Sequence, residues 1–186
     1  MLIDASKPAR AAPGAHRYNL AYIWAISATA ALGGLLFGYD WVVIGGAKPF
    51  YEPYFRLTSD AQIGWANSCA LLGCLIGSIL SGVLSDRLGR KILLVAAAFL
   101  FGVSSLLTGW AHGFDTFVLW RLLGGVAIGI ASNVSPTYIA EIAPAAWRGR
   151  LVTLNQLTIV LGILAAQIVN LMIAGHVADN ATPEMI

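Results

Sequence analysis

Five long apolar segments alternate with short polar stretches along the chain. They are residues 20–47, 62–84, 91–111, 115–140 and 151–174. A helix of about 20 apolar residues is long enough to cross the hydrocarbon core of a membrane. Because the connecting stretches are short and hold most of the charged residues, the pattern predicts an all-α membrane protein with five transmembrane helices.

The second apolar segment carries small side chains at intervals of four residues. Two such series are present: Gly73, Gly77, Ser81 and Ser85, and Ala70, Cys74, Ser78 and Gly82. Small residues along one face of a helix let a neighbouring backbone approach closely. We therefore expect this helix to pack tightly against another one.

The composition supports a membrane protein. Hydrophobic residues make up 58% of the 186 residues and charged residues 11%, whereas a soluble domain carries about 25% charged residues. The first apolar segment is far longer than the apolar core of a signal peptide, which has about 7–15 residues. We therefore expect this segment to remain in the protein as a helix.

Basic residues concentrate on one side of the predicted helices. Eight of them precede the first helix or join the second to the third and the fourth to the fifth, namely Lys7, Arg10, Arg17, Arg87, Arg90, Lys91, Arg148 and Arg150. The other side has only Lys48 and Arg56. Because cytoplasmic loops are enriched in Lys and Arg, we expect residues 1–19 to form a cytoplasmic tail. After five crossings, residues 176–186 would lie in an outer loop.

Two charged residues lie inside the predicted helices. Asp40 follows an apolar run in the first helix, and Arg121 lies six residues into the fourth. At a rise of about 1.5 Å per residue, both lie about 9 Å below the outer ends of their helices, so they could meet at one level. Charges at such depth are costly and usually functional, which points to a proton or solute pathway. A structural alternative is that Arg121 extends its charged end to the interface.

Two further stretches have a distinctive order of residues. Residues 82–91 read Gly-Val-Leu-Ser-Asp-Arg-Leu-Gly-Arg-Lys, and residues 121–129 contain an arginine followed by spaced glycines. The first stretch resembles the loop between the second and third helices of the major facilitator superfamily, and the second resembles its fourth helix. Residues 136–151 narrow the resemblance to the sugar porter family, and residues 154–167 resemble the fifth helix of hexose and pentose transporters.

The resemblance covers about residues 20–175 and is strongest to bacterial proton–xylose symporters and facilitative glucose transporters. That family has twelve helices in two halves of six, with the substrate between the halves. The resemblance therefore implies that residues 20–175 are the first five helices of an N-terminal six-helix half. Helices 6–12 would be missing partners of the same transporter.

The resemblance also implies roles for individual residues. It implies a cytoplasmic gate made of charged side chains at the inner helix ends: Asp86, Arg87, Arg90, Glu141 and Arg148. Gln156 would hydrogen-bond sugar hydroxyls, since an amide both donates and accepts without carrying a charge. Phe37 would contact the sugar, and Ile159 and Ile163 follow Gln156 at helical spacing and could line the same cavity. Ordinary charges at helix ends are the structural alternative for the gate.

These observations favour the N-terminal portion of a proton-coupled monosaccharide symporter that works by alternating access. Asp40 would bind the proton and Arg121 would modulate its affinity, because an ionisable side chain can carry a proton. The proton is the coupling ion, and we expect no other cofactor and no metal. The first alternative is a facilitative sugar uniporter, whose members usually have a neutral residue at the position of Asp40. The second is a membrane fragment that does not transport.

The expected surroundings follow from the same interpretation. The substrate would be a hexose or a pentose, and the protein would lie in the lipid bilayer of a bacterial inner membrane with its N-terminus in the cytoplasm. The sequence contains no nucleophile–base constellation, no metal-ligand spacing and no phosphate-binding loop. We therefore expect neither an enzyme nor a nucleic-acid partner.

Overall fold

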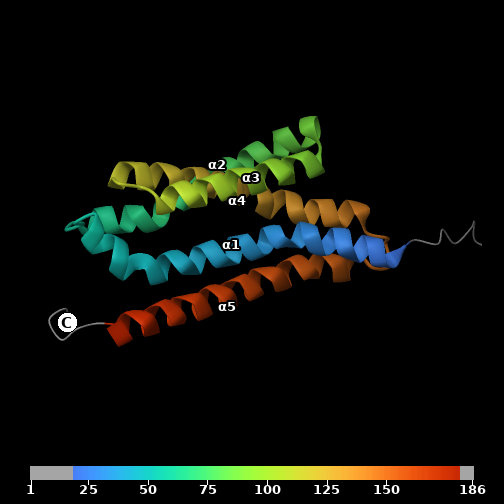
Figure 1. Ribbon diagram of the computed structural model, residues 1–186. Helices are drawn as coiled ribbons and strands as arrows, with labels where there is room; N and C mark the ends of the chain where they lie inside the picture. Colours follow the sequence, from blue (N-terminus) through green and yellow to red (C-terminus); the bar gives the residue numbers. More distant parts are fainter. Residues whose placement is uncertain (1–18, 181–186) are drawn as a thin grey trace, which may run out of the picture.

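The computed structural model describes the backbone of residues 19–180 and the side chains of residues 19–175. Within this range it contains five helices: α1 (Leu20–Tyr54), α2 (Asp60–Leu88), α3 (Arg90–Gly109), α4 (Phe114–Ile142) and α5 (Arg148–Asn180). Each has the length and apolar composition of a membrane-spanning helix. Figure 1 shows them running roughly along one direction in an elongated bundle. The predicted all-α architecture with five spans is therefore confirmed for this part of the chain.

The helices run back and forth, so the bundle has two distinct ends (Figure 1). The start of α1, the turn between α2 and α3, and the connection between α4 and α5 lie together at one end, which we call the Arg90 end. The connection between α1 and α2, the connection between α3 and α4, and the end of α5 lie at the opposite end, which we call the Tyr51 end.

The first helix is longer than its apolar pattern predicted. Its start is capped by Asn19, whose Oδ1 accepts a hydrogen bond of 3.2 Å from the backbone N of Tyr22. It continues beyond residue 47 to Tyr54, through Pro49 and Pro53. Proline removes a helical hydrogen bond and bends a helix without always ending it, and Figure 1 shows α1 bending at this end.

The last helix also exceeds the prediction. It runs to Asn180, so the predicted outer loop of residues 176–186 begins as helix. Residues 181–186 lie outside the described residues. Residues 1–18, most of the predicted cytoplasmic tail, lie outside them as well.

Glycines bring α2 and α4 into close contact. A Cβ atom added at Gly73 or Gly77 would overlap backbone carbonyl groups of α4, and one added at Gly125 or Gly129 would overlap carbonyl groups of α2. Only residues without a side chain permit two backbones to approach this closely. The predicted tight packing of the second segment is confirmed, and its partner is α4.

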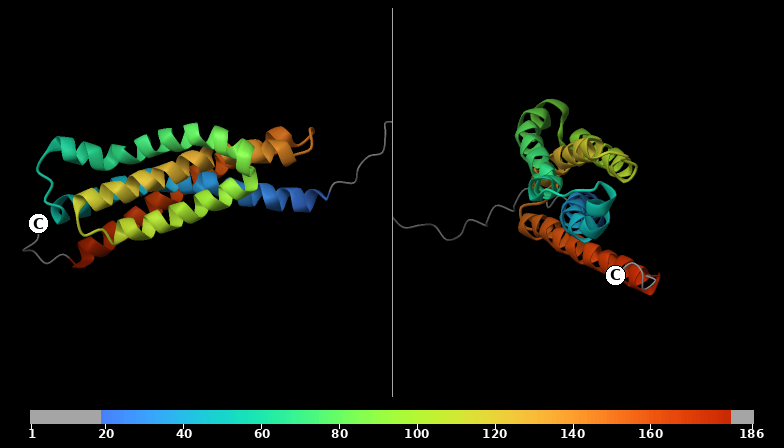
Figure 2. Two further views of the ribbon diagram at one scale, coloured as in Figure 1. Left: turned by 90° about the horizontal axis from the view of Figure 1, so that it is seen from above. Right: turned by 90° about the vertical axis from the view of Figure 1, so that its left-hand side faces the viewer.

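The contact between α1 and α5 is built in the same way. A Cβ atom at Gly38 would overlap the carbonyl of Ile159, and one at Gly162 would overlap the carbonyl of Leu35. Seen end-on in Figure 2, α1 lies between α5 on one side and the other three helices on the other. Glycines therefore bring α5 as close to α1 as α4 is to α2.

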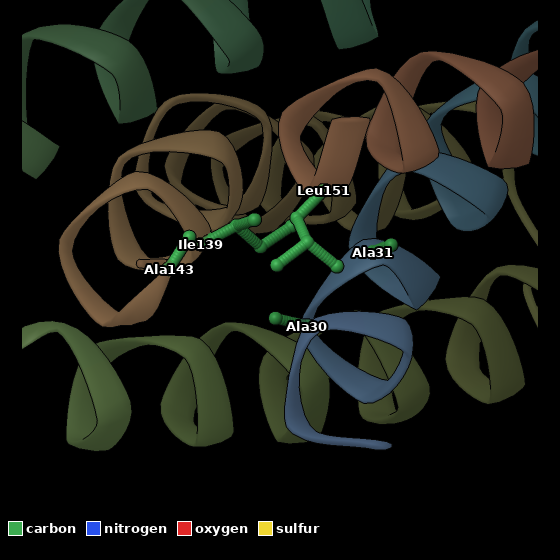
Figure 3. Packing of buried hydrophobic residues seen from close by; sticks show 5 residues of the cluster. All are labelled: Ala30, Ala31, Ile139, Ala143 and Leu151. Carbon is green, nitrogen blue, oxygen red and sulfur yellow. The ribbon is translucent and has the colours of Figure 1, made fainter. Parts of the chain in front are cut away.

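A cluster of buried apolar residues closes the Arg90 end. It joins α1, the end of α4 and the start of α5, and its members are Ala30, Ala31, Ile139, Ala143 and Leu151. Figure 3 shows these side chains meeting where the three elements converge. The cluster holds the end of α4 and the start of α5 against α1.

Candidate functional site

The two charges predicted inside the membrane form an ion pair. Nη1 of Arg121 on α4 donates a hydrogen bond of 2.7 Å to Oδ1 of Asp40 on α1. The side chains are only 8% and 14% exposed, respectively. The prediction that they lie at one level is confirmed, and the alternative of an arginine reaching for the interface does not hold.

A large cavity borders this pair. It has a volume of about 750 Å³, lies between α1, α3 and α4, and is lined mainly by apolar side chains. The polar side chains in its lining include Asp40, Arg121, Tyr51 and Ser104, together with the indole of Trp120. Its volume falls within the range of about 300–1,000 Å³ typical of ligand pockets. The ion pair is therefore buried in the protein and also reachable from a cavity.

The predicted sugar-contacting residues lie elsewhere. Gln156 and Ile163 are exposed on α5, while Phe37 and Ile159 are half-buried. None of these four residues lines the cavity beside the ion pair. Leu157, Val160 and Leu164 also expose much of their surface on α5. An exposed amide within a long apolar helix indicates a face that meets another protein element or a water-filled space.

A buried polar network fixes the rotation of α5. The Ser135 hydroxyl on α4 hydrogen-bonds the carbonyl of Ala30 on α1 and Oδ1 of Asn155 on α5. The Thr158 hydroxyl donates a bond of 2.6 Å to the carbonyl of Ala31. Sequence reasoning missed this network. Because it holds Asn155 inward, the next residue on the helix, Gln156, is left exposed.

The predicted gate residues gather at the Arg90 end, around Arg90 itself. Its Nε lies 3.0 Å from Oε1 of Glu141, and its Nη1 lies 3.4 Å from Oδ1 of Asp86. Nη1 also donates to the carbonyl of Ser85. Gly89 makes this possible, because its φ of +84° allows a sharp turn between α2 and α3 that other residues rarely adopt. Arg90 thus ties the ends of α2, α3 and α4 together.

Two predicted gate residues stand apart from this cluster. Arg87 and Arg148 are exposed and form no ion pair with any residue in the described part of the chain. In this structure the ion-pair partner of Glu141 is Arg90. Arg148 opens α5, whereas Arg90 opens α3 and its side chain reaches Glu141 at the end of α4.

Asn67 lies close to the ion pair of Asp40 and Arg121, although sequence reasoning did not select it. Its Nδ2 donates bonds of 2.9 Å to the hydroxyl of Tyr51 and to the carbonyl of Ile63. Asn67 and Trp41 also line a small cavity on the α2 side of the ion pair. An amide inside the apolar segment 62–84 was the available signal for this residue.

Residues 26–182 match the protein family described as "Sugar (and other) transporter". This match covers most of the chain. The chain belongs to the sugar transporter family. Members of the sugar transporter family are transporters, so the protein is not an enzyme.

Two members of the sugar transporter family are similar over most of this chain. The glucose transport protein of Synechocystis is 43% identical over 162 residues, which are 87% of this chain and 34% of the relative. The D-xylose-proton symporter of Escherichia coli is 39% identical over 183 residues, covering 85% of this chain and 37% of the relative. The chain therefore spans about a third of the length of these relatives.

A solved structure shows the same fold. The inward open conformation of the xylose transporter XylE from E. coli matches with a TM-score of 0.77 at 39% identity, over 82% of this chain and 40% of XylE. The predicted fold class, five helices of the N-terminal half of a major facilitator transporter, is confirmed by this similarity.

Proposed function

We propose that this chain forms the first five helices of a proton-coupled monosaccharide symporter. The observation that carries the proposal is the buried pair of Asp40 and Arg121. Protonation of a carboxylate removes its charge and hence its attraction to a neighbouring guanidinium. Binding of a proton at Asp40 would therefore release Arg121 and change the contact between α1 and α4. Such a change is what alternating access requires of a coupling residue.

We propose a hexose or a pentose as the substrate. The relatives described above are named for glucose and xylose. Gln156 has the chemistry to hydrogen-bond a neutral polyol, and its exposure leaves it free to do so. Phe37, Ile159 and Ile163 would supply apolar contacts. The remaining contacts would come from helices 6–12, which face the first half across the substrate in this architecture.

We propose that the Arg90 end faces the cytoplasm of a bacterial cell and that the helices lie in the inner membrane. The excess of Lys and Arg at the connections of this end supports this orientation. The cluster of Arg90, Glu141 and Asp86 would then act as the cytoplasmic gate. Arg87 and Arg148 would join it only in another conformation.

Proton and sugar fluxes test the proposal directly. The transporter that carries this sequence is expressed in a bacterial strain unable to take up xylose or glucose, and the external pH is recorded when sugar is added. We expect sugar-dependent alkalinisation for the unchanged protein and none for Asp40→Asn. Asp60→Asn, an exposed carboxylate at the start of α2, is the matched control and should behave like the unchanged protein.

The same experiment distinguishes a proton symporter from the main alternative, a facilitative uniporter. A facilitative uniporter would take up sugar without any proton flux, and Asp40→Asn would leave that uptake intact. Unchanged proton-coupled uptake in Asp40→Asn would contradict the role of Asp40.

A further inference from the structure

An exposed tryptophan follows the acid of the ion pair on α1. Trp41 comes directly after Asp40, and 43% of its surface is exposed. On the α2 side of the ion pair it lies beside Asn67 and Leu71. Along the helix it is about 20 Å from the nearer end of α1, whereas tryptophans that anchor a helix in a membrane gather at the interfaces. An interfacial role therefore does not account for Trp41.

Trp41 shares a face of α1 with Phe37, one turn earlier. Successive residues of an α-helix are rotated by about 100°, so a spacing of four residues leaves the two rings about 40° apart around the axis. Gly38 marks the direction of α5, because a Cβ atom there would overlap the carbonyl of Ile159. Phe37 and Trp41 are rotated from that direction by about 60–100°, both in the same sense. They form an aromatic strip beside the contact of α1 with α5.

Gln156 and Ile163 lie on the matching face of α5. Gly162 marks the direction of α1, because a Cβ atom there would overlap the carbonyl of Leu35. Gln156 and Ile163 are rotated from that direction by about 100–120°, in the sense opposite to the rotation on α1. Since α1 and α5 run in the same direction, opposite rotations lead to the same side of the pair. The exposed amide and the aromatic strip therefore border one face of the bundle.

This face combines two kinds of contact that suit a monosaccharide. The Gln156 amide both donates and accepts hydrogen bonds, as sugar hydroxyls do. The C–H groups on the faces of a sugar ring are apolar and weakly positive, and the faces of an aromatic ring are apolar and weakly negative. A purely apolar occupant would leave the amide unpaired, which is costly where water is excluded.

We propose that Trp41 is a further sugar-contacting residue, whose indole stacks on a C–H face of the sugar ring while Gln156 binds hydroxyls. Side chains on a helix lean toward its start, so the indole leans from Trp41 toward the level of Phe37. Because Trp41 also adjoins Asp40, the bound sugar lies next to the ion pair. The inference rests on the proposed function, since it adds a contact to the same sugar site.

Uptake kinetics of the transporter that carries this sequence test the role of Trp41. The probes are radiolabelled D-xylose and D-glucose. We expect Trp41→Leu to raise KM about 3- to 10-fold with kcat nearly unchanged, because it removes an aromatic contact made in binding. Trp41→Phe keeps an aromatic ring and should restore most of the lost affinity.

Trp65→Leu is the matched control for these variants. Trp65 is exposed to a similar extent, 40%. It precedes Asn67 by two residues, so it lies on the opposite side of α2. We expect Trp65→Leu to leave KM unchanged.

The possible outcomes separate this inference from the proposed function. An unchanged KM in Trp41→Leu, a fall in kcat alone, or equal rises in KM for Trp41→Leu and Trp41→Phe would overturn the stacking role and leave sugar transport intact. If the unchanged transporter takes up neither sugar, the proposed function fails, and this inference fails with it.

Tryptophan fluorescence of the purified transporter gives a second test that does not require a variant to transport. We expect the transported sugar to change the emission of the unchanged protein and of Trp65→Phe to the same extent. The change should be smaller in Trp41→Phe, because the indole that touches the sugar is gone. An equal change in all three proteins would refute stacking on Trp41.

Discussion

Two of the ion-pair sites among the described residues have similar geometry and very different surroundings. Arg121 and Asp40 lie 2.7 Å apart with side chains 8% and 14% exposed. Arg90 and Glu141 lie 3.0 Å apart with side chains 30% and 47% exposed. The distances are nearly the same, so distance alone does not separate the two sites. Burial does, because the attraction between charges and the cost of leaving one unpaired both grow as water is excluded.

The difference in burial implies different behaviour for the two ion pairs. An exposed pair can break and re-form at little cost, since water replaces each lost contact. A buried pair is held until one partner loses its charge. Under the proposed function, the Arg90 site would open and close during the transport cycle and the Asp40 site would bind the proton.

Removal of one member of the buried pair should have the largest effect. Asp40→Ala leaves the Arg121 charge buried without a partner, so we expect the free energy of unfolding to fall by about 3–5 kcal/mol. Chemical denaturation of the chain in mixed detergent micelles measures this. The double variant Asp40→Ala with Arg121→Leu removes both charges and should recover most of the loss. A cost below about 1 kcal/mol for the single variant would mean that the pair is effectively solvated.

A substitution that separates α2 from α4, the helix that carries Arg121, should have the next largest effect on the free energy of unfolding. A Cβ at Gly125 would overlap the carbonyl of Ala70, so Gly125→Ala should cost about 1–3 kcal/mol by forcing α4 away from α2. The same denaturation experiment applies. Gly82→Ala is the control, because a Cβ there meets nothing within 4 Å. Equal behaviour of the two variants would contradict the close contact of α2 and α4.

Removal of the exposed pair should have a small, salt-sensitive effect. Glu141→Gln should cost about 0.2–1 kcal/mol, as is usual for surface ion pairs. Because salt screens exposed charges, the cost should shrink further when unfolding is measured at about 1 M salt. A cost that is large and independent of salt would place Glu141 in the same class as Asp40.

The smallest effect should come from Asp86. Its side chain is 77% exposed and lies 3.4 Å from Arg90, so Asp86→Asn should change the free energy of unfolding by less than about 0.5 kcal/mol. Denaturation of Asp86→Asn beside Glu141→Gln checks the ranking. A greater loss for Asp86→Asn than for Glu141→Gln would reverse it.

Sequence reasoning predicted the helices and the meeting of Asp40 with Arg121 at one level. The rise of a helix per residue is constant, so the depths of Asp40 and Arg121 could be counted from the ends of their segments. The ion-pair partner of Glu141 could not be predicted from the helical rise. Whether Arg87, Arg90 or Arg148 reaches Glu141 depends on the turn at Gly89 and on how α3 packs against α4.

Helix ends and the contacts of buried amides were harder to predict from the sequence, because they depend on the surrounding structure. Pro49 and Pro53 are typical of a helix end, yet α1 continues through both and bends. Asn67 stood out only as a polar residue in an apolar segment. Its contacts with Tyr51 and with the small cavity depend on α1, which is distant in the sequence.

The sequence by itself determined that residues 20–174 form five helices long and apolar enough to span a membrane, and that an acid and a base lie at one depth within them. Apolar length and helical rise are local properties, so they can be read along the chain. Only the tertiary structure decided that α1 packs on α5 and α2 on α4, that Arg90 holds Glu141, and that Asn67 borders the buried pair. These outcomes depend on the rotation of each helix about its axis, which is set by close packing between segments far apart in the sequence.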